Sequence, residues 1–440
     1  MQDYLEIIEN TLQTGTLEEN RTNEYTIADF GYSYKVELGS GYPLLTTKQM
    51  DTFRWDSMLH EVEWYLSGTH HIRKLTEESG IWDAWADDEY NLPSAYGRFW
   101  RRYPVPEVDA QLRGEEWMDR DSQWTQIEQT TEITFVYTDP LNGDASERAL
   151  EDVAELEGSV GENARTYVDY PRVEEGSTST HVTVPVTVSH HDEKVLSSII
   201  EEFREDCRDN VDIHDFDVSS STLTFDQVQF VVDALNGDNP YRGPESRRLL
   251  ITAWHPANAQ ESSLPPCHFT YVLNVQDGEL NVHLTQRSAD IALGVPFNIA
   301  SYGLMGQLIA QQTGYRLGEF SHTLVDAHAY CGREERSEWY GENIGELQER
   351  VRNANQKADY QDIKSWILEN APEDKGGTNV EEHNYGYDHV PGLLEQLSRE
   401  PMSRPVLEIA DDVTVNNVSY EDFNLKDYNS HEGLRFSVAE

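Results

Sequence analysis

Cysteine is scarce in this 440-residue chain, which contains only Cys207, Cys267 and Cys331. The three are odd in number, lie far apart and form no Cys-x-x-Cys pair, which excludes a disulfide framework and a cysteine-rich zinc site. Two histidine pairs, His70–His71 and His190–His191, also lack the ligand spacing of a metal site. We therefore expect no bound metal.

Positive charge is also scarce. The chain has 33 Lys and Arg residues, only eight of them lysines, against 81 Asp and Glu residues, for a formal net charge of −48. Phosphate backbones require a basic surface, so nucleic acid is excluded as a partner. A disordered acidic protein is disfavoured because 38% of the residues are hydrophobic and ten are tryptophans. This excess of negative charge indicates a halophilic protein. Concentrated salt would screen the repulsion between its charges.

Long apolar runs are absent. No uninterrupted stretch is long enough to cross a bilayer. The first ten residues, Met-Gln-Asp-Tyr-Leu-Glu-Ile-Ile-Glu-Asn, lack the basic region and the apolar run of a signal peptide. We expect a cytoplasmic protein without a membrane partner.

The length exceeds that of a usual single domain, which favours one large core with additions, or two to three domains. Composition divides the chain into five segments. Residues 1–104 and 226–331 are dense in aromatic and aliphatic side chains and predict α/β structure. Residues 105–225 predict a small α+β insertion, residues 332–387 an acidic helical insertion, and residues 388–440 a helix followed by short strands.

Local patterns predict individual elements. An amphipathic helix is predicted where apolar residues keep a helical period, at Trp55, Met58, Leu59, Val62, Tyr65 and Leu66. Glu61 falls at the edge of this stripe, where a carboxylate can face a cleft. Strands are predicted at Thr131–Tyr137, Thr180–Val188, Leu249–Trp254 and Phe269–Val275. Two further helices are predicted at about Glu193–Arg208 and Phe297–Thr313, the latter ending at Gly314.

The segment Pro265-Pro266-Cys267-His268 places a thiol behind a stiff lead-in. A thiol becomes a nucleophile where cations stabilise its thiolate, and arginines bind phosphates through forked contacts. Arg287 follows this segment, and Arg247 and Arg248 precede it, which suggests a phosphorylated substrate attacked by sulfur. By spacing alone, the alternatives stay open: a buried structural cysteine, arginines paired with the abundant carboxylates, and a cysteine protease.

Seven short motifs occur together and in order. They are Tyr42-Pro-Leu-Leu-Thr-Thr-Lys48, Ile81-Trp-Asp-Ala-Trp-Ala86, Tyr96-Gly-Arg98, Pro266-Cys-His268, Gln286-Arg-Ser-Ala-Asp290, Gly294-Val-Pro-Phe-Asn-Ile-Ala-Ser-Tyr302 and Asp326-Ala-His-Ala-Tyr330. In these motifs the chain resembles the folate-dependent thymidylate synthases that use a cysteine nucleophile. The resemblance covers about residues 1–103, 226–330 and 388–440.

The resemblance implies an α/β (α+β) fold, the thymidylate synthase fold, in which helices flank a large mixed β-sheet, with the two acidic insertions added. It implies reductive methylation of dUMP to dTMP, with 5,10-methylenetetrahydrofolate as the one-carbon and hydride donor and dihydrofolate as a product. In the family a cysteine thiolate adds to C6 of the uracil ring, and C5 then attacks the methylene carbon of the folate. Cys267 matches that nucleophile.

The resemblance also assigns site residues. Those matching dUMP ligands are Arg21, Gln286, Arg287, Ser288, Asp290, Asn298, His328 and Tyr330 of one subunit, with Arg247 and Arg248 reaching across from its partner. Asn298 matches the asparagine on the N3 and O4 edge of uracil, where an amide offers both a donor and an acceptor. Those implied to act in catalysis are Cys267, Glu61, Tyr96, His268, Arg287, Asp290 and Asn298. Of these, His268 resembles a triad base, but the family places it in a water network.

The folate site implied by the resemblance is largely flat and apolar. Its matching residues are Lys48, Ile81, Trp82, Trp85, Asp290, Leu293, Gly294, Phe297 and Ala439. The resemblance further implies a homodimer. Two other functions stay open: a pyrimidine deoxynucleotide hydroxymethylase on the same fold, and an inactive homologue that only binds. Asn298 and Trp82 favour the synthase over the hydroxymethylase. The insertions could be solvated additions or extra dimer surface.

Overall fold

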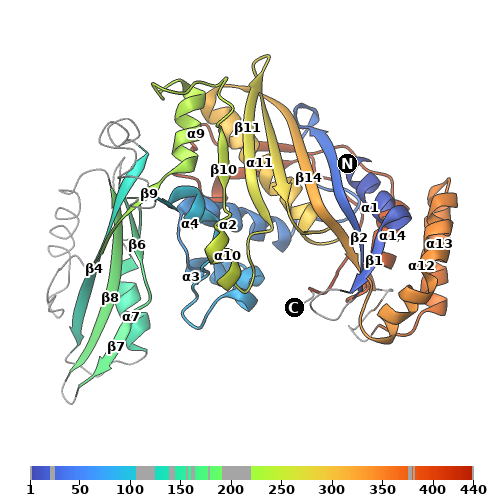
Figure 1. Cartoon of the computed structure of the whole chain (residues 1–440), viewed down its shortest axis with the longest axis horizontal. Coiled ribbons are helices and arrows are strands. Elements are labelled where there is room, and N and C mark those ends of the chain that lie inside the picture. The colour runs from blue at the N-terminus through green and yellow to red at the C-terminus, as the bar shows by residue number, and fades with distance from the viewer. Residues whose placement is uncertain are drawn as a thin grey trace.

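A mixed β-sheet forms the centre of the molecule in a computed structural model of the chain (Figure 1). The structure describes residues 2–19, 25–105, 124–137, 144–154, 157–159, 164–176, 179–190, 220–374, 379 and 382–438. The central sheet has the strand order β1-β2-β14-β12-β11-β10, and β13 pairs with β14. Its strands are β1 (Thr16–Glu19), β2 (Tyr25–Glu37), β10 (Leu250–Thr252), β11 (His268–Gln276), β12 (Glu279–Gln286), β13 (Ala289–Asp290) and β14 (Arg316–Tyr330). The predicted strands at Leu249–Trp254 and Phe269–Val275 are confirmed as β10 and β11.

The sheet is mixed because β14 runs parallel to β12 and β13, while the other neighbours are antiparallel. Parallel neighbours need a long crossover, and helix α11 (Gly294–Thr313) supplies it between β12 and β14. It ends, as predicted, at Gly314, whose φ of 74° is left-handed. The helix begins one turn earlier than predicted. Asp290 Oδ1 accepts the N–H groups of Ala292 and Leu293 and so orders the chain just before the helix.

Helix α2 (Phe53–Ser67) confirms the predicted amphipathic helix, with Met58, Leu59 and Val62 buried in the core. The remaining helices around the central sheet are α1 (Gln2–Thr14), α3 (Arg73–Glu78), α4 (Tyr96–Arg101), α9 (Gln227–Asn236), α10 (Pro256–Glu261) and α14 (Val390–Leu397). Short 3-10 turns lie at η1 (Leu38–Ser40), η2 (Gly80–Trp85) and η5 (Tyr420–Asp422). Among the described residues, none of the helices has the length and apolarity needed to cross a membrane.

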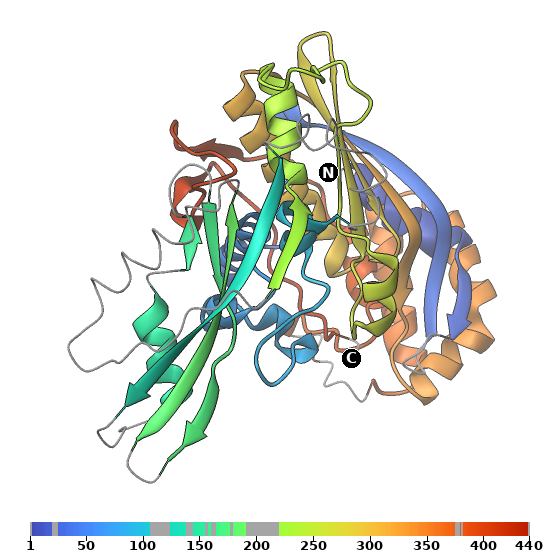
Figure 2. The ribbon, with the colours of Figure 1, turned by 60° about the vertical axis from the view of Figure 1, so that its left-hand side comes forward.

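A second sheet stands on one flank of the molecule, apart from the central sheet (Figures 1 and 2). Its strands are β3 (Tyr103–Pro104), β4 (Thr125–Tyr137), β5 (Gly158–Ser159), β6 (Ala164–Val168), β7 (Arg172–Glu175), β8 (Thr180–His190) and β9 (Ser220–Phe225), with helix α7 (Ala145–Val153) against it. The predicted strands Thr131–Tyr137 and Thr180–Val188 are confirmed within β4 and β8. The predicted helix at Glu193–Arg208 lies outside the described residues.

This second sheet has its own apolar cluster, in which Phe135, Val182 and Val184 of β4 and β8 pack with Ala149 and Val153 of α7. A separate cluster of this kind marks a unit with its own core. The boundaries at residues 105 and 225 stay a proposal, and the second sheet extends beyond the first of them. Tyr103 and Pro104 of β3 belong to the preceding segment but pair with β9.

The acidic segment 332–387 is helical, as predicted, and lies on the opposite flank (Figure 1). Its helices α12 (Glu335–Asn353) and α13 (Lys357–Asn370) are anchored on α1. Gln348 Nε2 donates to Gly15 O at 2.7 Å, and Tyr360 OH donates to Glu9 Oε1 at 2.7 Å. The last segment contains α14 followed by the short strands β15 (Val406–Ile409) and β16 (Phe423–Lys426), which confirms the prediction for residues 388–440.

Candidate active site

Cys267 lies immediately before β11, and its sulfur is half-buried. Arg287, directly after β12, is held against the same segment. Its side chain donates to Pro265 O at 2.7 Å and Pro266 O at 3.0 Å, and its Nη2 lies 3.8 Å from Cys267 Sγ. The pairing of β11 with β12 brings these residues together, because His268 lies opposite Gln286. A guanidinium at this distance favours the thiolate over the thiol.

Tyr96 and His268 form the wall behind the sulfur. Tyr96 OH accepts the N–H of Cys267 at 2.8 Å, and its ring stacks on His268 with centroids 4.0 Å apart. His268 Nδ1 lies 2.6 Å from Tyr302 OH. Burial lowers the pKa of His268 to about 3. The imidazole is therefore neutral at physiological pH, which disfavours a role as a triad base.

Asn298 ends a chain of buried polar groups. Its Nδ2 donates to Gln286 Oε1 at 3.0 Å, and His322 Nε2 lies 3.2 Å from the same oxygen. Gln286 Nε2 in turn donates to Ser288 O at 3.0 Å, and His322 Nδ1 lies 2.7 Å from Tyr34 OH. These bonds fix how the Asn298 amide is turned, so its remaining groups have a defined orientation. His322 and Tyr34 belong to no quoted motif, and the sequence analysis missed them.

Asp290, His328 and Tyr330 gather where β13 meets β14, because Asp290 lies opposite His328 in the register. The rings of His328 and Tyr330 are 5.3 Å apart and perpendicular. Burial opposes ionisation of Asp290, but His389 and the N–H of Leu293 hold the pKa of its carboxyl below the usual value. Burial also opposes protonation of His328, yet hydrogen bonding to Asp326 raises its pKa overall.

His389 is a third residue that the sequence analysis missed. Its Nδ1 lies 3.7 Å from Asp290 Oδ1, its Nε2 lies 3.0 Å from Ser437 O, and its ring packs on Phe436. It therefore joins the C-terminal segment to the site. In the sequence, His389 directly precedes Val390 and Pro391 at the start of α14. This position indicates a structural role and gives no sign of a functional one.

Glu61 of α2 is buried, with only 7% of its surface exposed, and points toward η2. Trp82 Nε1 donates to Glu61 Oε1 at 2.7 Å. The Trp82 ring also lies 5.9 Å from the ring of Tyr96, which contacts Cys267. Glu61 is thus connected to the backbone of Cys267 through two aromatic side chains. Burial raises the pKa of its carboxyl, although its hydrogen bonds oppose the change.

The raised pKa of Glu61 gives a test of stability. Ionising a buried carboxyl that has a raised pKa lowers the free energy of unfolding. The stability of the wild type should therefore fall as the pH rises from about 4.3, the pKa of this carboxyl in the unfolded chain, through its pKa in the folded chain. Glu61→Gln should therefore unfold at a higher temperature than the wild type at pH 8, and the difference should vanish near pH 4. Turnover of the variant should fall despite its gain in thermal stability. Calorimetry at both pH values checks this, and a lower melting temperature of the variant at pH 8 contradicts it.

The residues predicted to contact folate are mainly apolar and lie in η2 and at the start of α11, the latter close to Asp290. The rings of Trp82 and Trp85 lie 5.8 Å apart, and Ile81 is 42% exposed. Leu293, Gly294 and Phe297 are half-buried around the start of α11. An aromatic and aliphatic surface with one ionised carboxylate suits a planar heterocycle that carries N–H groups.

Lys48, which the resemblance assigns to the folate site, is buried. It is 2% exposed, its Nζ donates to Ala292 O at 2.6 Å, and it lies 5.5 Å from the centroid of the Phe436 ring. Burial and the neighbouring Arg54 lower its pKa to about 7, although Asp290 opposes the shift. In this conformation Lys48 bridges the segment before α11 and the C-terminal segment.

Arg247 and Arg248 are not brought to Cys267 of their own chain. Both are exposed in the turn before β10. Because Leu250 pairs with Val272 and Thr252 with Thr270, this turn lies beyond the end of β10 that is farther from Cys267. At about 3.3 Å per strand residue, the separation is roughly 20 Å. Arg21 and Ala439 lie outside the described residues.

No group of three or more His, Cys, Asp or Glu side chains that could hold a metal is found among the described residues. The predicted pair His70–His71 is engaged instead with carboxylates of the second sheet. His70 Nε2 lies 2.9 Å from Asp169 Oδ1, and His71 Nε2 lies 2.6 Å from Glu157 Oε1. These histidines join the second sheet to the core.

Comparison with known proteins shows the family of the chain. A sequence model of the thymidylate synthase family matches residues 2–141 and 191–440. The match thus includes residues 332–387 and omits only 142–190 between its ends. The chain is also 42% identical to a thymidylate synthase of Haloferax volcanii over 435 residues, which make up 99% of this chain and 96% of that protein. The chain belongs to the thymidylate synthase family.

Proposed function

We propose that this chain converts dUMP to dTMP by reductive methylation, with 5,10-methylenetetrahydrofolate as co-substrate and dihydrofolate as the second product. The observation that carries the proposal is the contact between Arg287 and Cys267. One guanidinium supports the thiolate and fixes the backbone that presents it. A nucleophile held in this way is suited to attack an electron-poor ring carbon such as C6 of uracil. The inactive homologue is disfavoured because the nucleophile and its support are both intact.

The substrate dUMP would lie across Cys267, with its base toward Asn298 and its sugar toward His328 and Tyr330. Gln286 orients the amide of Asn298, which can then offer both a donor and an acceptor to the N3 and O4 edge. Arg287 and Ser288 would bind the phosphate, together with Arg21 of the same chain. His268 is neutral and buried, and it would support the position of Tyr96 instead of exchanging protons.

Folate would stack on the surface of Trp82, Trp85 and Phe297, with Asp290 accepting from its N–H groups. When bound, it supplies a carbon at the methylene level and then a hydride. Glu61 would order the water that moves protons, and Tyr96, which accepts the N–H of Cys267, would lie near the C5 proton as it leaves. Ile81, Leu293 and Gly294 would close the apolar pocket, with Ala439 beyond the described residues.

Product analysis tests this function. The full chain in concentrated salt is incubated with dUMP and 5,10-methylenetetrahydrofolate, and both products are identified by mass. The proposal expects dTMP and dihydrofolate in equal amounts. A 5-hydroxymethyl product with tetrahydrofolate would identify a hydroxymethylase, and unchanged dUMP with retained binding would identify an inactive homologue.

The choice of base gives a further prediction. Asn298→Asp should shift preference from dUMP toward dCMP, because a protonated carboxyl presents the hydrogen bonds that cytosine requires. The ratio of kcat/KM for the two nucleotides should move by on the order of 100-fold, since unmatched buried polar groups discriminate strongly. Steady-state kinetics with both nucleotides checks this. An unchanged dUMP preference with no gain for dCMP contradicts the position given to Asn298.

We further propose a homodimer in which each site borrows Arg247 and Arg248 from the partner subunit. Both arginines are exposed and remote from Cys267 of their own chain. The central sheet also offers a face for the second copy. Along β12, the buried Val282 alternates with the half-exposed Asn281 and His283, so one face of the strand lies in the core while the other is partly open. Nucleic acid and membranes are not partners in this proposal.

The charge of −48 supports a halophilic enzyme of the cytoplasm, with the insertions 105–225 and 332–387 as additions to a core of residues 1–104, 226–331 and 388–440. Two subunits of this charge repel each other and repel an anionic nucleotide and folate. At about 1 M salt the Debye length falls to about 3 Å, which removes the long-range repulsion and leaves short-range arginine contacts in place.

A further inference from the structure

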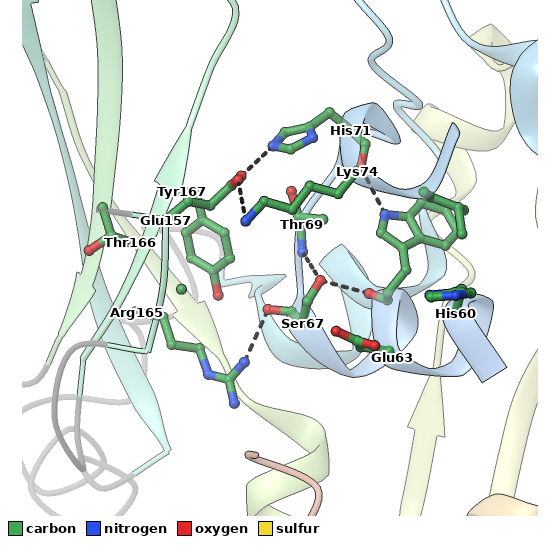
Figure 3. Close-up of a pocket in the computed structure, with 13 residues that line it drawn as sticks. His60, Glu63, Ser67, Thr69, His71, Lys74, Glu157, Arg165, Thr166 and Tyr167 are labelled. Atoms are coloured by element: carbon green, nitrogen blue, oxygen red, sulfur yellow. Dashed lines mark hydrogen bonds and ion pairs between the residues drawn. The ribbon is translucent and has the colours of Figure 1, made fainter. Parts of the chain in front are cut away.

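A cavity of about 180 Å³ lies between helix α2 of the core and strands β5 and β6 of the second sheet (Figure 3). It is distinct from the surroundings of Cys267, and none of the residues assigned above to catalysis or ligand binding lines it. Its lining residues come from both units of the fold: His60, Glu63, Trp64, Ser67, Thr69, His71, Lys74, Leu75, Glu157, Gly158, Arg165, Thr166 and Tyr167.

The charged groups around the cavity already have partners. Glu157 contacts both His71 Nε2 at 2.6 Å and Lys74 Nζ at 3.1 Å. Arg165 Nη1 donates to the backbone oxygen of Ser67 at 3.1 Å, as Figure 3 shows, and Glu63 Oε2 accepts the N–H of Tyr420 at 3.0 Å. Among the described lining residues, the carboxylates of Glu63 and Glu157 balance the charges of Lys74 and Arg165, so the lining favours an uncharged ligand.

Three hydroxyl groups of the lining are buried and have no partner among the described residues. They are Thr69 Oγ1, Thr166 Oγ1 and Tyr167 OH, the last on a side chain that is 3% exposed. Figure 3 shows the Tyr167 hydroxyl directed toward the space between Arg165 and Ser67. An unpartnered buried hydroxyl costs free energy, which a ligand with a matching polar group would recover. The walls around them are supplied by Trp64, Leu75 and the Tyr167 ring.

The size of the cavity limits the ligand. An apolar protein cavity of about 150 Å³ is large enough to hold benzene, so this one accommodates a single ring with a small substituent. We propose that the cavity is a second ligand site, which binds a neutral single-ring aromatic molecule carrying a hydroxyl or carbonyl group, and that its occupancy is transmitted to Glu61. The ring would pack on Trp64, and its polar group would bond to Tyr167 and Thr69.

The connection to Glu61 follows the aromatic side chains. The Trp64 ring, on the cavity wall, lies 5.8 Å from the ring of Trp82, whose Nε1 donates to Glu61 Oε1 at 2.7 Å. Trp64 and Glu61 also share helix α2. A ligand that moves Trp64 therefore displaces Trp82 and with it the carboxylate. This part of the inference depends on the role proposed for Glu61, whereas binding to the cavity does not.

Binding is tested with phenol as the probe and toluene as its counterpart without the hydroxyl, by calorimetric titration of the full chain in concentrated salt. Phenol should saturate one site per chain and bind more tightly than toluene. Tyr167→Phe and Thr69→Val keep the shape and remove one hydroxyl each. Each substitution should raise the Kd for phenol roughly 5- to 10-fold, which is the range for the loss of one hydrogen bond. Neither should lower the melting temperature of the free protein.

Tyr170→Phe, outside the cavity, is the matched control and should leave phenol binding unchanged. The site is overturned if phenol does not saturate, or if Tyr167→Phe and Tyr170→Phe behave alike. The link to Glu61 predicts that phenol changes kcat without raising KM for dUMP, and that Tyr167→Phe weakens this effect in step with binding. Saturable phenol binding with unchanged kcat overturns the link, and competition with dUMP overturns the assignment to a separate site.

Discussion

Replacing Cys267 with alanine is expected to lower dTMP formation by on the order of 10⁴-fold or more, because the bond to C6 is proposed to form with its sulfur. Affinity for dUMP should change little. Two of the hydrogen bonds that position Arg287 go to the backbone oxygens of Pro265 and Pro266, which the variant retains. Turnover and equilibrium binding of dUMP, measured on the same preparation, check both parts.

The other two cysteines provide the controls. Cys331 is fully buried at the end of β14, and Cys207 lies outside the described residues. Neither belongs to a matched motif, so Cys207→Ala and Cys331→Ala should turn over dUMP like the wild type. Appreciable turnover by Cys267→Ala would show that the Cys267 sulfur is not the nucleophile. Loss of activity in the control variants alone would show that another cysteine carries the chemistry.

Mixing two inactive variants should restore activity. One carries Cys267→Ala, and the other carries Arg247→Glu with Arg248→Glu. In a mixed dimer, one of the two sites has an intact thiol and receives intact arginines from the other chain. With random exchange in a two-fold dimer, about a quarter of the wild-type activity should return. Activity measured before and after exchange in concentrated salt checks this, with mass measurement to confirm the mixed dimer.

The salt dependence of this mixture separates assembly from chemistry. Dilution into low salt should dissociate the dimer and abolish the restored activity, because repulsion between subunits of charge −48 is then unscreened. Mixing Cys267→Ala with itself gives the background. If mass confirms mixed dimers and the mixture stays inactive, the arginines do not act across the interface.

Elements with a regular apolar pattern were predictable from the sequence. Helix α2 follows from the spacing of its buried residues, and the end of α11 follows from Gly314. Strands β4 and β8 follow from their β-branched residues, whereas the short strands β5 and β7 of the same sheet carry too few residues to show a period. Motif residues such as Cys267 were located by resemblance, and the structure supplies the contact with Arg287.

What the sequence does not reveal depends on contacts between distant segments. His389 meets Asp290 only because the start of α14 packs beside β13, and no spacing links the two. Lys48 is buried among distant segments, where it contacts Phe436 and Ala292, and its sequence position does not show these contacts. The cavity at Trp64 and Tyr167 exists because the second sheet docks on α2. Such features come from tertiary packing and not from local patterns.

Tracing the hydride tests the central claim most directly. The chain is supplied with dUMP and 5,10-methylenetetrahydrofolate that carries deuterium at C6 of the pterin, and the nucleotide product is analysed by mass. The account predicts dTMP whose methyl group contains one deuterium, formed in step with dihydrofolate. A product without deuterium, with oxygen added at the new carbon, would contradict the account, because the hydride then never reaches the nucleotide.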